Sequence, residues 1–218
     1  AVTAVTDGSS VTHDDTVPTL TTIVESVNGA GNGNNGDTVT LTITPSEAIQ
    51  QPVCSFSSGG AAMAASPSYG TGSNNIRTCS IVVADADTNG AVTFSVAYED
   101  SAGNAGVADT TADSGAVTID NTHPTLGTVG IVTGGAGNAN NGDSVTLTFT
   151  ASETIGAPTC TMKDGAGATM DNSVTVTNTN VGGNIWTCVI VVHDNDATGS
   201  LTFSIAYTDS AGNAGVAD

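Results

Sequence analysis

The chain has few basic side chains. Arg77 and Lys163 stand against 21 acidic residues among 218, which gives a formal net charge of −19 at pH 7. A nucleic acid is bound through a basic surface that meets its phosphates, so nucleic-acid binding is excluded. No stretch is long and apolar enough to span a bilayer, and we expect no membrane insertion. So much charge of one sign opposes a compact state unless cations neutralise it, although acidity alone also keeps an extracellular protein soluble.

Catalytic signatures are also missing. No serine lies in a Gly-x-Ser-x-Gly turn with a histidine and an aspartate placed to assist it. The histidines, at positions 13, 123 and 193, do not repeat as a site and show no metal-ligand spacing. Aromatic residues make up only 4% of the chain, so Glu47 and Glu153 lack the aromatic cleft that sugar chemistry generally uses. The sequence predicts that the protein is not an enzyme.

The four cysteines fall as one pair in each half of the chain. No Cys-x-x-Cys spacing or nearby histidine accompanies them, which disfavours a zinc site. We therefore expect one disulfide in each half, Cys54–Cys79 and Cys160–Cys188. Disulfides indicate an oxidising compartment, and hence an extracellular or cell-surface protein.

The chain contains two copies of one unit. The run Tyr-Glu-Asp-Ser-Ala-Gly-Asn-Ala-Gly at 98–106 returns at 207–215 with one substitution, and the linker around Asp14 returns around Asp120. A closing segment at 116–120 follows the first copy, whereas its match, at 10–14, precedes that copy. We divide the chain into a displaced last strand (1–14), a first domain (15–120) and a second, incomplete domain (121–218).

Alternating apolar and threonine residues predict β-strands. In the clearest strand, Val39, Leu41 and Ile43 alternate with threonines, which is the period of two of a half-buried strand. We expect strands at 19–27, 37–44, 53–56, 78–83, 91–98 and within 112–119, then at 144–150, 159–162, 187–192 and 200–207, with an irregular edge after residue 56. Short, regularly spaced strands predict an all-β fold of two tandem immunoglobulin-like antiparallel sandwiches, with the cysteines of the first on the strands at 53–56 and 78–83.

The second sandwich lacks its own last (G) strand in this reading. An unpaired edge and an open core are states that proteins avoid. The N-terminal segment, with Val5, Val11 and His13, has the pattern to fill the gap. An identical subunit donates this strand, or the chain is one period of a longer covalent array; both give a head-to-tail polymer.

Carboxylates converge where the chain enters each sandwich, an end that we call the linker pole. The linker and two turns, which follow the strands at 37–44 and 91–98 in the first repeat, bring oxygen ligands there: Asp14, Asp15, Glu47, Asp100 and Asn104 in the first repeat, and Asp120, Glu153, Asp209 and Asn213 in the second. Calcium binds six to eight such oxygens in flexible geometry. Asp37, Asp85, Asp87, Asp143, Asp194 and Asp196 lie in turns at the opposite pole, either as further ligands or as ordinary Asx turns.

Three motifs resemble the bacterial-type immunoglobulin-like repeats of giant cell-surface adhesins. They are Thr/Ala-x-Ser-Glu at the end of the strand at 37–44, Tyr-x-Asp-x-Ala-Gly-Asn at the end of the strand at 91–98, and Asp-x-x-x-Pro in the linker, each with its copy in the second repeat. The resemblance implies extended stalks with calcium at domain junctions, and ligand roles for Asp14, Glu47, Asp100, Asn104, Asp120, Glu153, Asp209 and Asn213. The regular cysteine pair is unusual for bacterial stalks and leaves a eukaryotic surface protein open.

These observations predict a structural repeat subunit of an extracellular filament or cell-surface stalk, built from identical units. The alternative is an adhesive module that binds a glycan or ice through threonine rows such as 38–42. The many serines and threonines leave O-linked glycans possible.

Overall fold

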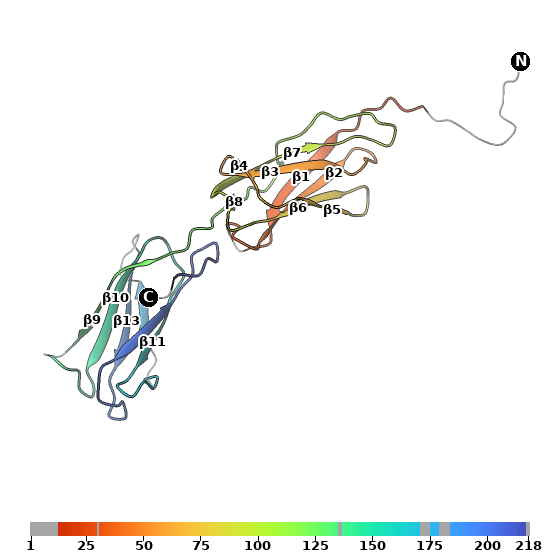
Figure 1. Ribbon diagram of the computed structural model, residues 1–218. Helices are drawn as coiled ribbons and strands as arrows, with labels where there is room; N and C mark the ends of the chain where they lie inside the picture. Colours follow the sequence, from red (N-terminus) through yellow and green to blue (C-terminus); the bar gives the residue numbers. More distant parts are fainter. Residues whose placement is uncertain (1–12, 30, 135–136, 171–174, 179–183, 217–218) are drawn as a thin grey trace, which may run out of the picture. The chain divides into compact units, whose positions relative to one another are not determined.

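The structure, a computed structural model, describes residues 13–29, 31–134, 137–170, 175–178 and 184–216 (Figure 1). The chain separates into two compact units, the first comprising residues up to 28 and 33–120, and the second residues 29–32 and 121–218. The described residues contain strands and turns but no helix, and so no helix that could cross a membrane. Each unit is an antiparallel β-sandwich.

The first unit packs one four-stranded sheet on another. The first sheet has the order β1-β2-β6-β5 and the second the order β4-β3-β7-β8, which is the arrangement of an immunoglobulin sandwich. The strands are β1 (Leu20–Val27), β2 (Thr38–Pro45), β3 (Val53–Ser58), β4 (Ala61–Ala62), β5 (Ser68–Thr71), β6 (Arg77–Val82), β7 (Gly90–Ala97) and β8 (Thr118–Ile119).

The alternation of apolar residues and threonines in the sequence identifies the residues that form the core. Val39, Leu41 and Ile43 of β2 are each 0% exposed, while the threonines between them are half-buried on the other face. The facing sheet contributes Phe94 and Val96 of β7, which are also buried. With few aromatic residues, this core depends on close packing of branched aliphatic side chains.

The second unit repeats most of this plan. One sheet has the order β12-β13-β10-β9, and β11 pairs with β14 in the other. The strands are β9 (Leu126–Thr133), β10 (Ser144–Ala151), β11 (Thr159–Lys163), β12 (Thr175–Asn178), β13 (Ile185–Val191) and β14 (Thr202–Ala206). Among the described residues β14 is the last strand of this unit, and it pairs with β11.

Each unit carries the predicted disulfide. Cys54 on β3 is bonded to Cys79 on β6, and Cys160 on β11 to Cys188 on β13, with Cα atoms 6.4 Å apart in both pairs. Each bond therefore joins the two sheets of its sandwich. A cross-link closing a loop of this size contributes about 3 kcal/mol to stability by restricting the unfolded chain.

Some elements differ from the prediction. The segment expected to be an irregular edge contains β4 and β5, and the first and fourth strands of the second unit, β9 and β12, were not predicted. All four strands lie at sheet edges, where they pair on one side only, and β5 exposes three of its four residues. Most other boundaries shift by one or two residues.

The last strand of the first unit, β8, is short, and residues before it also form hydrogen bonds with neighbouring strands. Asp113 N–H donates to Ile23 O (2.9 Å), and Glu25 N–H donates to Ser114 O (3.0 Å) beside β1. The segment then reaches β7, where Val92 N–H donates to Val117 O (2.8 Å). Val117 is 5% exposed and Ile119 1%. The closing segment thus seals the sandwich with two apolar side chains.

Candidate metal centre

The Tyr-x-Asp-x-Ala-Gly-Asn-Ala-Gly motif builds a compact turn after β7. Gly106 N–H donates to Tyr98 O (3.0 Å), and a Cβ on residue 106 would lie 2.2 Å from the Tyr98 ring. Only glycine permits this approach. The second unit does the same with Tyr207 and Gly215, and the Tyr207 hydroxyl donates to Val216 O (2.9 Å). These tyrosines are corner residues of the fold.

Asp100 organises the turn. Its Oδ1 accepts hydrogen bonds from the N–H groups of Ala102 (2.8 Å) and Asn104 (2.9 Å), and its Oδ2 accepts one from Asn104 Nδ2 (2.8 Å). The residue is 1% exposed. Asn104 Nδ2 also donates to Asp14 O (2.9 Å), so the same amide ties the linker to the turn.

Hydrogen bonds keep Asp100 ionised despite its burial. Burial alone would raise the pKa of this carboxyl group. The hydrogen bonds from the Asn104 side chain and from the N–H groups of Asn104, Ala102 and Gly103 outweigh burial and lower the pKa below its ordinary value. A fixed negative charge is therefore present at the linker pole at neutral pH.

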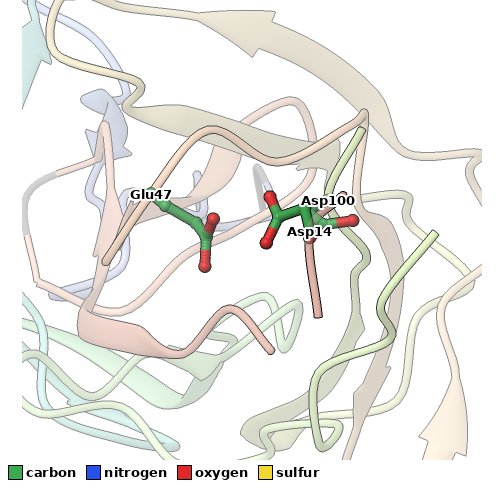
Figure 2. Close-up of side chains that lie close together, drawn as sticks. All are labelled: Asp14, Glu47 and Asp100. Atoms are coloured by element: carbon green, nitrogen blue, oxygen red, sulfur yellow. The ribbon is translucent and has the colours of Figure 1, made fainter. Parts of the chain in front are cut away.

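Asp14, Glu47 and Asp100 meet at this place (Figure 2). One oxygen of each carboxylate lies within 4.8 Å of one oxygen of each of the others. Asp14 comes from the linker, Glu47 from the turn after β2 and Asp100 from the turn after β7. Within the described residues neither Arg77 nor Lys163 forms an ion pair with a carboxylate. Three like charges at such distances repel one another, and the repulsion falls when a cation lies among them.

The oxygen atoms at the centre suit calcium. Both oxygens of Asp100 accept hydrogen bonds within the turn, and Asp14 and Glu47 bring further carboxylate oxygens beside them. Glu47 is half-buried and Asp14 exposed, so water can complete the coordination. Carboxylate oxygens and water are the ligands that calcium takes. Asn104 lies at the centre, where its amide nitrogen positions Asp100 and the linker.

The second unit reproduces the turn. Asp209 Oδ1 accepts hydrogen bonds from Ala211 N–H and Asn213 N–H, each 2.9 Å, and Asn213 Nδ2 donates to Asp209 Oδ2 (2.8 Å). A Glu153 oxygen lies within 4.8 Å of an Asp209 oxygen. Asp120, the counterpart of Asp14, is half-buried in the first unit and accepts a hydrogen bond from Asn89 Nδ2 (3.3 Å).

The aspartates at the opposite pole mainly close their own turns. An oxygen of each accepts the N–H of the residue three positions earlier: Asp37 from Asn34, Asp87 from Ala84, Asp143 from Asn140 and Asp196 from His193. These local hydrogen bonds from the backbone to a side chain close each turn, which is the alternative to a role in metal binding. Asp85 and Asp194 are exposed, and Asp15 lies 3.4 Å from His13 Nε2.

Two buried carboxyl groups were missed by sequence reasoning. Asp164 accepts hydrogen bonds from the N–H groups of Ala197, Ala168 and Ala166, with Ala197 contributing most, and these lower its pKa. Burial raises the pKa of Glu25, and a hydrogen bond from Val117 N–H only partly offsets the effect. Asp164 lies in an Asp-Gly turn signal, whereas a glutamate in a strand gives no signal of burial.

The sheets and the repeated turn define the class as tandem immunoglobulin-like sandwiches. No protein-family model and no curated protein matches the chain. Solved structures that match include the I-band fragment I67–I69 of titin, with 9% identity and a TM-score of 0.47 over 91% of this chain and 63% of that one. The mouse nectin-like molecule 4 ectodomain matches with 13% identity and a TM-score of 0.35 over 90% of this chain and 62% of that one. A tetra-tandem repeat from the extending region of a large adhesion protein matches with 18% identity and a TM-score of 0.33 over 90% and 47%. The chain spans less than two thirds of these proteins, and the likeness concerns the fold alone.

The Asp100 turn predicts a specific response to acid. Because the folded-state pKa of Asp100 lies below the unfolded value, its stabilising effect is complete above pH 3.8 and disappears as the pH falls further. Substituting Asp100→Asn should speed amide exchange at Ala102 and Asn104 at pH 7 by at least about tenfold. We expect the difference between parent and variant to shrink as the pH falls below 3.8, in hydrogen exchange followed by NMR. Equal exchange at pH 7 would show that the ionised carboxylate does not hold the turn.

Proposed function

We propose that the protein is a structural repeat unit of an extracellular filament or cell-surface stalk, in which units join head to tail by strand completion and calcium holds the linker poles. One observation carries the proposal. Phe94 of β7 is 8% exposed, whereas its counterpart on β14, Phe203, is 37% exposed. The same residue type at the same strand position thus differs in burial.

Neighbouring positions on the same strands show the same difference in burial between the two units. Val92 and Val96 of β7 are buried, while Leu201 and Ile205, at the corresponding positions along β14, are only half-buried. Ile131 on β9 is 44% exposed, whereas Glu25, its counterpart on β1, is 6% exposed beside the closing segment. These differences in burial between the two units lie at positions that correspond to those beside the last strand of the first unit. A strand of matching pattern that pairs with β14 would bury these side chains at about 25 cal/mol per Å² of apolar surface.

Residues 10–14 have that pattern. Val11, Thr12 and Asp14 repeat Val117, Thr118 and Asp120 at the same spacing. Of the predicted assembly residues, Val5 and Val11 lie outside the described part of the chain, and the His13 side chain is 79% exposed. In the proposed assembly this segment leaves its own unit and pairs with β14 of a second copy. Such a contact is heterologous and extends into a line of units.

Durability fits the same role. A disulfide joins the sheets of each sandwich, which indicates an oxidising, extracellular setting. The acidic residues at the linker pole provide the calcium centre in this proposal. The threonine rows do not favour the ice- or glycan-binding alternative, since Thr40 Oγ1 is hydrogen-bonded to Ser80 Oγ (3.0 Å) within its own sheet.

Assembly is tested by one pair of variants. Val11→Asp introduces a charge at the position that matches buried Val117, and Thr12→Asp introduces the same charge at the position that matches exposed Thr118. We expect the parent and Thr12→Asp to form linear oligomers that lengthen with concentration, and Val11→Asp to remain monomeric, in light scattering and electron microscopy. If the two variants behave alike, or the parent stays monomeric, strand completion is wrong. A single covalent mass of many units from native material under denaturing conditions would contradict donation by separate copies.

The calcium centre is tested with Glu47→Gln. Removing one of three carboxylate charges should weaken calcium binding at this centre about tenfold in isothermal titration. Asp85→Asn is the matched control, since it removes one exposed charge outside the centre. An equal loss in both variants would mean that calcium responds to net charge rather than to this centre.

A further inference from the structure

In the first unit, the chain that leads to β8 crosses from one sheet of the sandwich to the other and back. Before the crossing, Asp109 N–H donates to Val96 O on β7 (3.1 Å). Residues 113 and 114 then bond to β1, and after them Val92 N–H of β7 donates to Val117 O (2.8 Å). Residues 113–116 are exposed. Few apolar contacts therefore hold the crossing, residues 113–117, in place, and such a segment can open locally.

Glu25 of β1 lies directly under the crossing. Its N–H donates to Ser114 O (3.0 Å), and its Oε2 accepts the Val117 N–H (3.1 Å). Gly115, with φ +81°, brings the backbone so close that a Cβ on this residue would overlap Glu25 O. The crossing therefore covers the Glu25 carboxyl group and donates one hydrogen bond to it.

The other carboxyl oxygen of Glu25 has no partner among the described residues. Glu25 is 6% exposed, and its buried Oε1 accepts no hydrogen bond there. A carboxylate that is removed from water is stable only when hydrogen bonds or a cation compensate for the lost water. Asp100, which is also buried, accepts hydrogen bonds at both oxygens. Glu25 lacks this compensation.

No basic side chain of the first unit compensates a charge on Glu25. The strands packed against β1, which are β2, β3, β6, β7 and β8, contain Arg77 and disulfide-bonded cysteines but no other titratable residue. Arg77 donates to main-chain carbonyl groups. The chain leading through the crossing contributes Asp109 and Asp113, both acidic, and Asp113 Oδ2 accepts the Ile23 N–H (2.7 Å). An ionised Glu25 is therefore destabilised while the crossing covers it.

We propose that the crossing is a pH-dependent latch, which stays closed over protonated Glu25 and opens locally when Glu25 is ionised. Opening lets water reach the carboxylate and uncovers the hydrogen-bonding edges of β1 and β7, so the pH controls access to these edges. The latch belongs to the first unit and is independent of calcium and of assembly.

The direction of the pH dependence follows from burial. Burial raises the pKa of Glu25, and the hydrogen bond from Val117 N–H offsets only part of this effect. Because the folded-state pKa lies above the unfolded value, protonated Glu25 stabilises the closed latch. This contribution is complete below pH 4.5 and is lost as the pH rises through the folded-state pKa.

Amide protection in the full chain tests the latch. Hydrogen exchange followed by NMR gives protection factors for the Glu25 and Asp113 amides, which bond across the crossing, and the carboxyl ¹³C shift of Glu25 follows its protonation. We expect both protection factors to fall by at least about tenfold between pH 4 and pH 8, with the same midpoint as the carboxyl titration. The Asp109 amide, which bonds to β7 before the crossing, should keep its protection.

Two isosteric variants assign the effect to Glu25. Glu25→Gln keeps an acceptor for Val117 N–H but carries no charge, so its protection factors should not change over this pH range. Asp113→Asn removes a charge from the crossing itself and should keep the pH dependence of the parent. Constant protection in the parent, or an equal fall at Asp109, overturns the latch even if a variant does not fold. The same pH dependence in Glu25→Gln as in the parent overturns the role of Glu25.

Discussion

The outer edge of strand β14, beside which no described strand lies, is the main constraint on the second sandwich. A sandwich whose core consists mainly of valine, leucine and isoleucine buries little aromatic surface. Each apolar residue that stays exposed therefore removes a substantial part of its hydrophobic stabilisation. In the first unit Val117 and Ile119 lie beside β7, and Val92, Phe94 and Val96 of that strand are buried. Among the described residues of the second unit none takes the place of Val117 and Ile119, and Phe203 and Ile131 are exposed. The strand donated in the proposed assembly would cover these side chains.

In the first unit, strand β7 connects the linker pole to the edge that the closing segment covers. Strand β7 ends at Ala97, and the turn organised by Asp100 follows directly after Tyr98. That turn holds the linker through Asn104 and leads into the closing segment, which returns along β7. Fixing the turn therefore also fixes where the last strand starts. In the proposed filament, calcium and strand completion would act on the same joint.

Most of the fold was predictable because its signals are local. Alternation at Val39, Leu41 and Ile43 located the central strand, and the paired cysteines located the link between sheets. The edge strand β5 escaped prediction because three of its four residues are exposed, which leaves no buried face for the sequence to show. The Asp14, Glu47 and Asp100 cluster followed from strand directions alone. The burial of Glu25 did not, because it depends on a segment about ninety residues later in the chain.

Hydrogen exchange at Leu201 tests the central claim most directly. The corresponding amide, Val92 N–H, donates to Val117 O in the first unit. If a donated strand pairs with β14, the Leu201 amide should exchange at least about a hundredfold more slowly in assembled parent protein than in the monomeric Val11→Asp chain. The same rate in both samples would contradict strand completion.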